Sequence, residues 1–304
     1  MNRWVVYQRE RFPLAGHAPL VAAFSASAVC FSSLLRGHVA VPPLRVLTVA
    51  FLTSLLFFLQ LRIADEFKDA EDDARFRPYR PVPRGLVTLG ELAWVGVAGA
   101  GVQFALALWL NPSLVWLLLL AWAYLALMTR EFFVARWLKV HPIIYMTSHM
   151  VILPIVDLYA TACDWRIAGL SAPPPGLVWF LIVSYLNGIV IEIGRKTRVP
   201  ADEEPGVDTY SALWGSQGAV RAWIGSILLT GAAAWQASAR IRTEAPTLVL
   251  LTVLTVASVG VAHRFVRHPT PGRGKTIETM AGIWTVLMYL GLGVGPVAIR
   301  LWRG

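Results

Sequence analysis

Six carboxylates fall within nine residues of this chain, and arginines and prolines follow them directly. The acids are Asp65, Glu66, Asp69, Glu71, Asp72 and Asp73, and the cations after them are Arg75, Arg77, Arg80 and Arg84. Carboxylates this close repel one another and lose hydration beside an apolar segment, here residues 46–61. A divalent cation relieves that repulsion, and a bound phosphate group then suits the arginines. The alternative is a solvated, charge-balanced loop between two membrane helices.

The spacing of the acids is helical. Asp65, Asp69 and Asp73 follow one another at intervals of four residues, and Glu66 lies three residues before Asp69. On one helix that continues from the apolar segment, these side chains point to roughly one face. Pro78 disfavours helical geometry at the residue before it, so we expect the helix to end there. The arginine–proline segment then folds back as an ordered loop.

The composition is that of a membrane protein. Hydrophobic residues make up 56% of the chain and charged residues 15%, and the charges fall in a few short stretches. This excludes a soluble globular domain and indicates a multi-pass protein of the lipid bilayer. The net charge of +9 lies in short loops between apolar segments, so positive-inside topology explains it and no nucleic acid partner is expected. The two cysteines predict no disulfide framework.

Nine apolar segments follow one another along the chain. They are residues 18–35, 46–61, 92–110, 114–128, 143–163, 177–191, 222–239, 247–262 and 279–299. Several are shorter than the roughly 20 residues that a span needs, so flanking residues must complete them. With nine spans, most of the 27 basic residues fall in the loops of one side, which predicts a cytoplasmic N-terminus. The loops after the second and sixth spans then face the cytoplasm.

The loop after the sixth span, residues 192–211, contains the same residue types as the acidic and arginine-rich residues 65–84. Cations come first, a proline follows, and acids come last: Arg195, Lys196, Arg198, Pro200, Asp202, Glu203 and Glu204. The two polar loops are four spans apart, which suggests two pseudo-repeated halves with one acidic loop each. Such loops can converge over a central cavity, and the alternative is two unrelated surface loops.

In the first polar loop the chain resembles the UbiA-type intramembrane prenyltransferase superfamily. The family's first motif is Asn-Asp-x-x-Asp-x-x-x-Asp, followed at fixed spacing by Arg-Pro-x-Arg-Pro and a glycine. The matching residues are Asp65, Glu66, Asp69 and Asp73, then Arg77, Pro78, Arg80, Pro81 and Gly85, without a gap. Asp65 in place of Asn and Glu66 in place of Asp are conservative departures.

The second motif of the family matches less well. Its pattern is Tyr, then Lys-Asp-x-x-Asp-x-x-Gly-Asp, then a glycine. The positions that agree are Lys196, Glu204 and the nearby Gly206, and the positions that depart are Glu192 for Tyr, Thr197 and Pro200 for two aspartates, and Glu203 for Gly. Carboxylates at shifted positions, Asp202 and Glu203, replace the missing aspartates. The chain therefore looks like a divergent branch of the family.

The resemblance implies an all-α membrane protein, with about nine transmembrane helices around a central cavity in one domain over residues 1–304. It implies Mg²⁺-dependent transfer of an isoprenyl group from a prenyl diphosphate to an aromatic or lipid-like acceptor. The implied metal ligands are Asp65, Glu66, Asp69 and Asp73 for one ion and Asp202, Glu203 and Glu204 for another. The implied diphosphate-binding cations are Arg77, Arg80, Arg84, Arg195, Lys196 and Arg198, which stabilise the leaving group. Among these residues, Asp69, Asp73 and Lys196 are expected to be catalytic.

The sequence gives weaker indications of the residues that bind the acceptor. Glu131, after the fourth span, and Glu192, at the end of the sixth, are candidates to orient or deprotonate an acceptor. His149, Asp157 and Asn187 are polar residues within or beside apolar segments, where such groups are functional candidates. A hydrogen-bonded helix–helix contact is the alternative for His149 and Asn187.

Two other functions stay open at this point. A membrane-bound terpene cyclase on the same scaffold captures the allylic cation within its own substrate. A non-catalytic transporter or binder of divalent cations or phosphorylated lipids uses the same charges without turnover. The transporter interpretation leaves the register of Arg77, Pro78, Arg80 and Pro81 unexplained.

Overall fold

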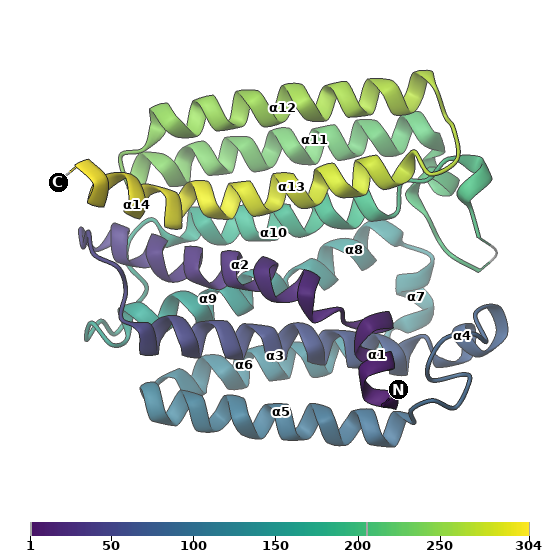
Figure 1. Ribbon diagram of the computed structural model, residues 1–304, viewed down its shortest axis with the longest axis horizontal. Coiled ribbons are helices and arrows are strands. Elements are labelled where there is room, and N and C mark those ends of the chain that lie inside the picture. The colour runs from purple at the N-terminus through teal and green to yellow at the C-terminus, as the bar shows by residue number, and fades with distance from the viewer. Residues whose placement is uncertain (1, 205, 304) are drawn as a thin grey trace. The chain divides into compact units, whose positions relative to one another are not determined.

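The computed structural model describes residues 2–204 and 206–303, which form helices and loops and contain no strand. By its internal contacts the chain divides into two compact units. The first unit comprises Met1–Val29, Pro42–Tyr145 and Ile155–Ala172, and the second comprises Cys30–Val41, Met146–Pro154 and Pro173–Gly304. Figure 1 traces the helices of both units along the chain.

The first unit is built on α3 (Leu44–Lys68), which packs against α5 (Leu89–Leu110) and α6 (Leu114–Thr129) (Figure 1). Its other elements are α1 (Arg3–Arg11), most of α2 (Leu14–Leu35), α4 (Ala70–Phe76), η1 (Glu131–Phe133), α7 (Ala135–Lys139) and most of α9 (Ile152–Trp165). A capping box fixes the start of α5, because Thr88 and Glu91 each accept a hydrogen bond from the other's backbone N–H. The loop that carries the arginines and prolines therefore ends at a defined point.

In the second unit, α10 (Leu177–Arg195) packs against α11 (Tyr210–Arg240) and α13 (Gly274–Leu292), and α12 (Glu244–Arg267) packs against the same two helices. The unit also holds η2 (Pro200–Asp202), α14 (Val294–Arg303) and half of α8 (Pro142–Met150). A buried hydrogen bond of 3.0 Å from Tyr289 to Ser184 joins α13 to α10. This contact holds the two helices together in the halves that lie away from the second polar loop.

The nine predicted apolar segments all lie in helices. Among the described residues, six helices are long and apolar enough to cross a membrane, or seven if α13 and α14, which are bent by 45°, form one span. Among them, α8 and α9 are taken together as Pro142–Trp165, and the 16-residue α6 is a shorter apolar helix. The predicted all-α membrane fold is confirmed, and the count of nine spans stays a prediction.

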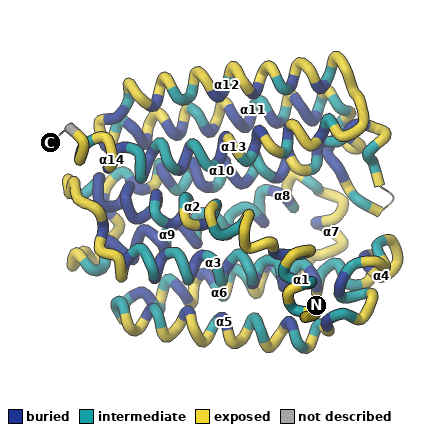
Figure 2. Tube along the Cα trace, viewed as in Figure 1, coloured by how far each residue is buried: buried dark blue, intermediate teal, exposed yellow. Residues whose placement is uncertain are grey.

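Exposed residues recur along α5 and α12 (Figure 2), and many of them are large apolar residues. Val249, Val253 and Val256 on α12 are each at least 60% exposed, and Trp94 on α5 is 75% exposed. Apolar surface of this extent is unfavourable in water and suits contact with lipid chains. The chain is an integral membrane protein.

The prediction that one helix carries all the motif acids is wrong. α3 ends at Lys68 and α4 begins at Ala70, so Asp69 lies at a break with φ −92° and ψ 5°, outside helical geometry. Beyond this break Asp73 lies in α4, where two arginines bind it. The prediction that Pro78 ends the helix is confirmed, because α4 stops at Phe76.

Candidate functional site

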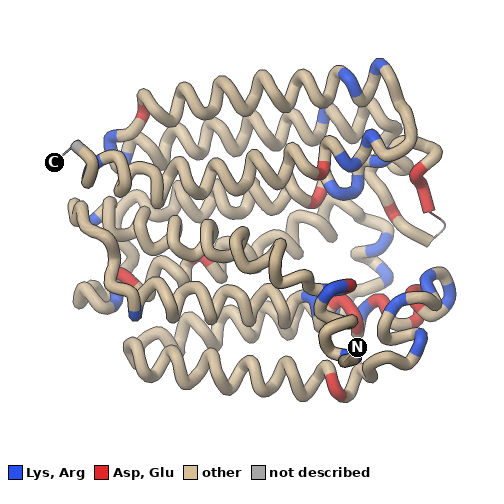
Figure 3. The backbone as a smooth tube through the Cα atoms, viewed as in Figure 1, with Lys and Arg blue, Asp and Glu red and all other residues tan. Residues whose placement is uncertain are grey.

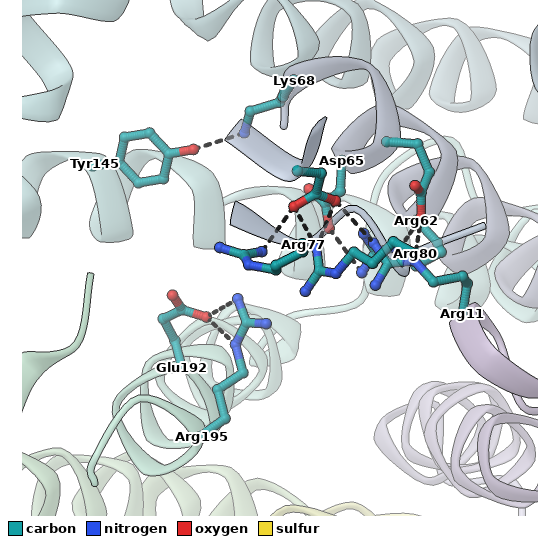
Figure 4. A network of polar contacts seen from close by, with 11 residues as sticks. Arg11, Arg62, Asp65, Lys68, Arg77, Arg80, Tyr145, Glu192 and Arg195 are labelled. Carbon is teal, nitrogen blue, oxygen red and sulfur yellow. Dashed lines mark hydrogen bonds and ion pairs between the residues drawn. The ribbon is translucent and has the colours of Figure 1, made fainter. Parts of the chain in front are cut away.

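Charge in the first unit gathers where the end of α3 meets α1 and α4 (Figure 3). The side chain of Asp73 is only 2% exposed, and its carboxylate accepts hydrogen bonds from Arg77 at 2.9 Å and from Arg80 at 2.8 and 2.7 Å. Figure 4 shows both guanidinium groups within this network. Charge-assisted bonds of this kind are among the strongest in proteins. The structure thus brings together three residues that the sequence predicted as a site.

Glu66 is the second acid that arginines hold. Its side chain is 1% exposed, it accepts a hydrogen bond from Arg11 at 2.5 Å, and Arg62 lies 3.4 Å away. Another nitrogen of Arg11 lies 3.9 Å from Asp73. Arg11 therefore joins two motif acids from α1. Sequence reasoning assigned this arginine to positive-inside topology, and no local signal distinguishes it from its neighbours.

Helix α1 is fixed on the motif by further contacts. Arg3 pairs with Glu91 at 2.6 Å, and Glu10 pairs at 2.9 Å with Arg84 of the arginine–proline loop. Tyr7 is 4% exposed and packs in a small apolar cluster with Ile63, Val87 and Leu92. The loop itself turns at Gly85, whose φ of +74° is strained for other residues. The predicted ordered loop is confirmed.

Of the four motif acids, Asp65 and Asp69 have the weakest contacts with arginines. The side chain of Asp65 is 43% exposed and lies 3.7 Å from Arg62. No cation forms an ion pair with Asp69 in the described part of the chain. Burial, followed by the carboxylates of Asp65 and Asp73, raises the pKa of Asp69.

Two repelling carboxylates one helical turn apart suit a divalent cation. Across residues 2–204 and 206–303, no group of three or more His, Cys, Asp or Glu side chains is gathered for a metal. Mg²⁺ is bound in many proteins by one or two carboxylates, with water and phosphate oxygens as the other ligands. Asp65 and Asp69 therefore fit this ion.

In the second unit, charge gathers at the end of α10 (Figure 3). The side chain of Glu192 is 7% exposed and binds Arg195 at 2.5 Å and Lys196 at 3.1 Å. Figure 4 shows the contact with Arg195. The ammonium of Lys196 also lies 5.8 Å from the centre of the Tyr210 ring. Because Glu192 already holds two cations, the geometry favours a role in positioning them over a role as a base.

The three acids of the second loop each bind a different group. Asp202 accepts from the Gly272 N–H at 2.8 Å, Glu203 from the Thr209 hydroxyl at 2.7 Å, and Glu204 from Arg198 at 3.2 Å. No three of these described acids are gathered for a metal, and each already has a protein partner.

A cavity of about 520 Å³ lies between this loop and the start of α13. Arg195, Arg198 and Lys275 are among the residues that line it. Gly274 permits the close approach of the two segments, since a Cβ there would lie 2.7 Å from the carbonyl oxygen of Thr197. Cations at the start of a helix favour phosphate binding.

The acceptor candidates lie in different surroundings. Glu131 accepts a hydrogen bond from Tyr145 at 3.3 Å, within a cluster that also contains Lys68. His149, Asp157 and Asn187 are at most 5% exposed and lie within α8, α9 and α10. Sequence reasoning singled out neither Lys68 nor Tyr145, because their contact joins positions far apart in the chain.

The chain was compared in sequence with family models and with curated proteins. A model of the UbiA prenyltransferase family matches residues 22–284. No curated protein matches the chain in sequence.

Several solved structures share the fold at low sequence identity. The apo structure of a UbiA homolog from Aeropyrum pernix K1 matches with a TM-score of 0.68 and 15% identity, over 93% of this chain and 98% of that one. A digeranylgeranylglyceryl phosphate synthase studied in membranes matches with a TM-score of 0.64 and 14% identity, over 98% of this chain and 100% of that one. A UbiA homolog from Archaeoglobus fulgidus bound to DMAPP and Mg²⁺ matches with a TM-score of 0.59 and 12% identity, over 96% of this chain and 99% of that one.

Proposed function

The chain belongs to the UbiA prenyltransferase family, and on this premise we propose that it is a Mg²⁺-dependent enzyme that transfers an isoprenyl group from a prenyl diphosphate to a hydrophobic acceptor. The proposal rests on the contacts that the acids and arginines of the first motif make with one another. Arg77 and Arg80 hold Asp73 at hydrogen-bonding distance, while Arg62 lies 3.7 Å from Asp65, beyond that distance, and no ion pair involves Asp69 in the described part of the chain. This arrangement offers carboxylate oxygens to a metal and guanidinium groups to a phosphate.

Asp65 and Asp69 are the proposed metal ligands, with Glu66 and Asp73 as their neighbours in the motif. When bound, Mg²⁺ would neutralise charge on the diphosphate and so assist cleavage of the bond to the prenyl group. Arg77, Arg80 and Arg84 would bind phosphate oxygens by exchanging one anionic partner for another. Because these arginines are held by Asp73 and Glu10, they are oriented before substrate arrives.

The second loop is proposed to act through its cations. Arg195, Lys196 and Arg198 would bind phosphate oxygens, and Glu192 would hold the first two in position. The acids Asp202, Glu203 and Glu204 would stabilise the loop through their present partners. This assignment replaces the second metal site that the family pattern implies.

The topology is part of the proposal. With nine spans, an excess of basic residues on one side supports a cytoplasmic location for the N-terminus and both acidic loops. A cysteine introduced at exposed Glu71 would then react with a membrane-impermeant maleimide only after cells are opened. Labelling of intact cells would contradict this orientation.

The function is tested with detergent-purified protein and a panel of prenyl diphosphates, with and without Mg²⁺. Lipid extract supplies acceptors in half of the samples. Release of diphosphate that needs Mg²⁺ supports the proposal, and its dependence on the extract indicates transfer. A cyclised product without extract would instead identify a terpene cyclase. Binding without release across the whole panel would indicate a non-catalytic binder or transporter and contradict the proposal.

A further inference from the structure

A polar cluster in the first unit joins three residues from three separate elements. Lys68, at the end of α3, donates a hydrogen bond of 2.7 Å to the hydroxyl of Tyr145 in α8, as Figure 4 shows. That hydroxyl donates to Glu131 of η1 at 3.3 Å, and the ammonium of Lys68 lies 3.9 Å from the same carboxylate. The tyrosine hydroxyl is thus held between a cation and an anion.

Burial of the charged side chains in this cluster has an unfavourable desolvation free energy. The side chains of Lys68 and Glu131 are 8% and 13% exposed, and the ammonium also lies 5.1 Å from the centre of the Tyr145 ring. A buried ion pair contributes little stability compared with apolar residues of the same size. Tyr145 is partly exposed, so the described chain does not fully enclose this residue.

The backbone that carries Glu131 is strained. Glu131, Phe132 and Phe133 have φ values of 46°, 52° and 60°, so three consecutive non-glycine residues occupy the left-handed region. Each such residue costs about 1 kcal/mol or more. Strain of this kind persists where the surrounding structure holds a side chain in a required position, and here that side chain reaches Tyr145.

The cluster is directly connected to the first motif. Lys68 immediately precedes Asp69, at the break between α3 and α4. A group fixed to Lys68 is therefore fixed relative to the proposed metal ligands Asp65 and Asp69. Lys68 and Tyr145 belong neither to the proposed metal ligands nor to the proposed phosphate-binding cations.

We propose that Tyr145 contacts the acceptor and takes its proton, with Lys68 and Glu131 as positioning residues. This inference rests on the proposed prenyl transfer. The bond between the prenyl carbon and the diphosphate breaks, and its electron pair leaves with the diphosphate. The acceptor oxygen forms the new bond to that carbon. Its proton passes to the oxygen of Tyr145 while the proton of Tyr145 passes to the Glu131 carboxylate.

The charges of the cluster select the class of acceptor. A phenol oxygen has two lone pairs, so it can accept an O–H from the acceptor beside the hydrogen bond from Lys68. The ammonium of Lys68 stabilises negative charge that develops on an oxygen and repels a protonated amine. The acceptor therefore presents a hydroxyl group and not an amine.

The test uses the full-length protein with Mg²⁺ and labelled farnesyl diphosphate, and it separates transfer from hydrolysis. Hexadecanol, 4-butylphenol and hexadecylamine are offered as acceptors, and prenylated product is counted apart from farnesol. Tyr145→Phe, Glu131→Gln and Lys68→Met should each lower transfer to the hydroxyl acceptors by about 100-fold. Farnesol formation should change by less than about threefold, since hydrolysis does not need this proton path. Glu131→Asp, which keeps the carboxylate, should retain part of the transfer.

Tyr185→Phe is the matched control, because Tyr185 is a partly buried tyrosine whose hydroxyl donates to the Thr147 carbonyl oxygen at 3.2 Å and not to a carboxylate. It should leave both reactions unchanged. Parallel loss of transfer and hydrolysis in the three cluster variants would show a purely structural role and overturn the inference. Transfer to the amine alone, or to none of the three probes while hydrolysis proceeds, would overturn the hydroxyl assignment. Absence of any diphosphate release from the unmodified protein would instead contradict the proposed function itself.

Discussion

Arg80 binds both carboxylate oxygens of Asp73, at 2.8 and 2.7 Å, through a single guanidinium nitrogen. Arg77 binds one of the same oxygens at 2.9 Å, and the aspartate side chain is 2% exposed. The fixed spacing between the acids and the arginines of the motif therefore has a structural cause. The arginines stabilise the segment in the absence of substrate and are already oriented to bind phosphate.

Asp73→Asn should destabilise the protein, because it leaves the partly buried Arg77 and Arg80 without the anion that they bind. Loss of one partner from a buried ion pair costs about 3 kcal/mol. Thermal melting in detergent, followed by tryptophan fluorescence, would show this as a clear decrease in Tm. Asp72→Asn is the control, since the Asp72 side chain is 56% exposed and 3.9 Å from Lys139. Equal Tm values for the two variants would contradict the proposed importance of the Asp73 network.

Asp69→Asn should have the opposite effect in the absence of Mg²⁺. Burial and the neighbouring carboxylates raise the pKa of Asp69, so its protonated form stabilises the fold. That contribution is fully present below the ordinary pKa of the group and is lost as pH rises through the raised pKa. At pH 7 the asparagine variant should therefore melt at a higher temperature than the unmodified protein.

Added Mg²⁺ should reverse this order. Binding to the native state raises the Tm of the unmodified protein, and the Asp69→Asn variant should show no comparable increase. Thermal melting over a Mg²⁺ series, with Ca²⁺ for comparison, measures the effect. If the variant responds to Mg²⁺ as the unmodified protein does, Asp69 is not a metal ligand.

Gly274→Ala should disturb the second loop. The added Cβ would lie 2.7 Å from the carbonyl oxygen of Thr197, so the start of α13 must move away from the loop. Such overpacking costs about 2 kcal/mol and should lower the Tm. Gly225→Ala in α11 meets nothing within 4 Å and should instead be neutral or stabilise the helix by up to about 1 kcal/mol. A neutral Gly274→Ala variant would show that the two segments do not need this contact.

Phe133→Gly should stabilise the protein by about 1 kcal/mol, since glycine adopts the left-handed conformation without strain. Phe133 has φ 60° and is 76% exposed, so little packing is lost. Val134→Gly is the control in the same loop, because Val134 has φ −128° and should lose about 0.5 kcal/mol. Chemical denaturation of the two variants measures the difference. A decrease in stability for Phe133→Gly would contradict the strain assigned to this turn.

The local features of the first motif were predictable from the sequence. The apolar segment that became α3, the arginines after the acids and the stop before Pro78 follow from residue types within a short window. The break at Asp69 was not predictable in this way. Asp69 is neither a glycine nor a proline, so its residue type does not mark a break in the helix.

The long-range contacts were not accessible from the sequence. Arg11 and Glu66 are 55 positions apart, and Asp202 and Gly272 are 70 positions apart. In the sequence these residues are an ordinary basic residue, a motif acid, a loop acid and a loop glycine. Only packing of the helices shows that Arg11 joins the first motif and that Asp202 is held by a backbone N–H.

The most direct test of the account is the initial rate of diphosphate release by purified protein as Mg²⁺ is titrated. The unmodified protein should be inactive with chelator and should saturate with Mg²⁺. Asp69→Asn should lower the saturated rate by at least about 100-fold, while the protein melts cooperatively. Release that is independent of Mg²⁺, or equal in the two proteins, would contradict the central claim that the first acidic motif binds the metal and the diphosphate.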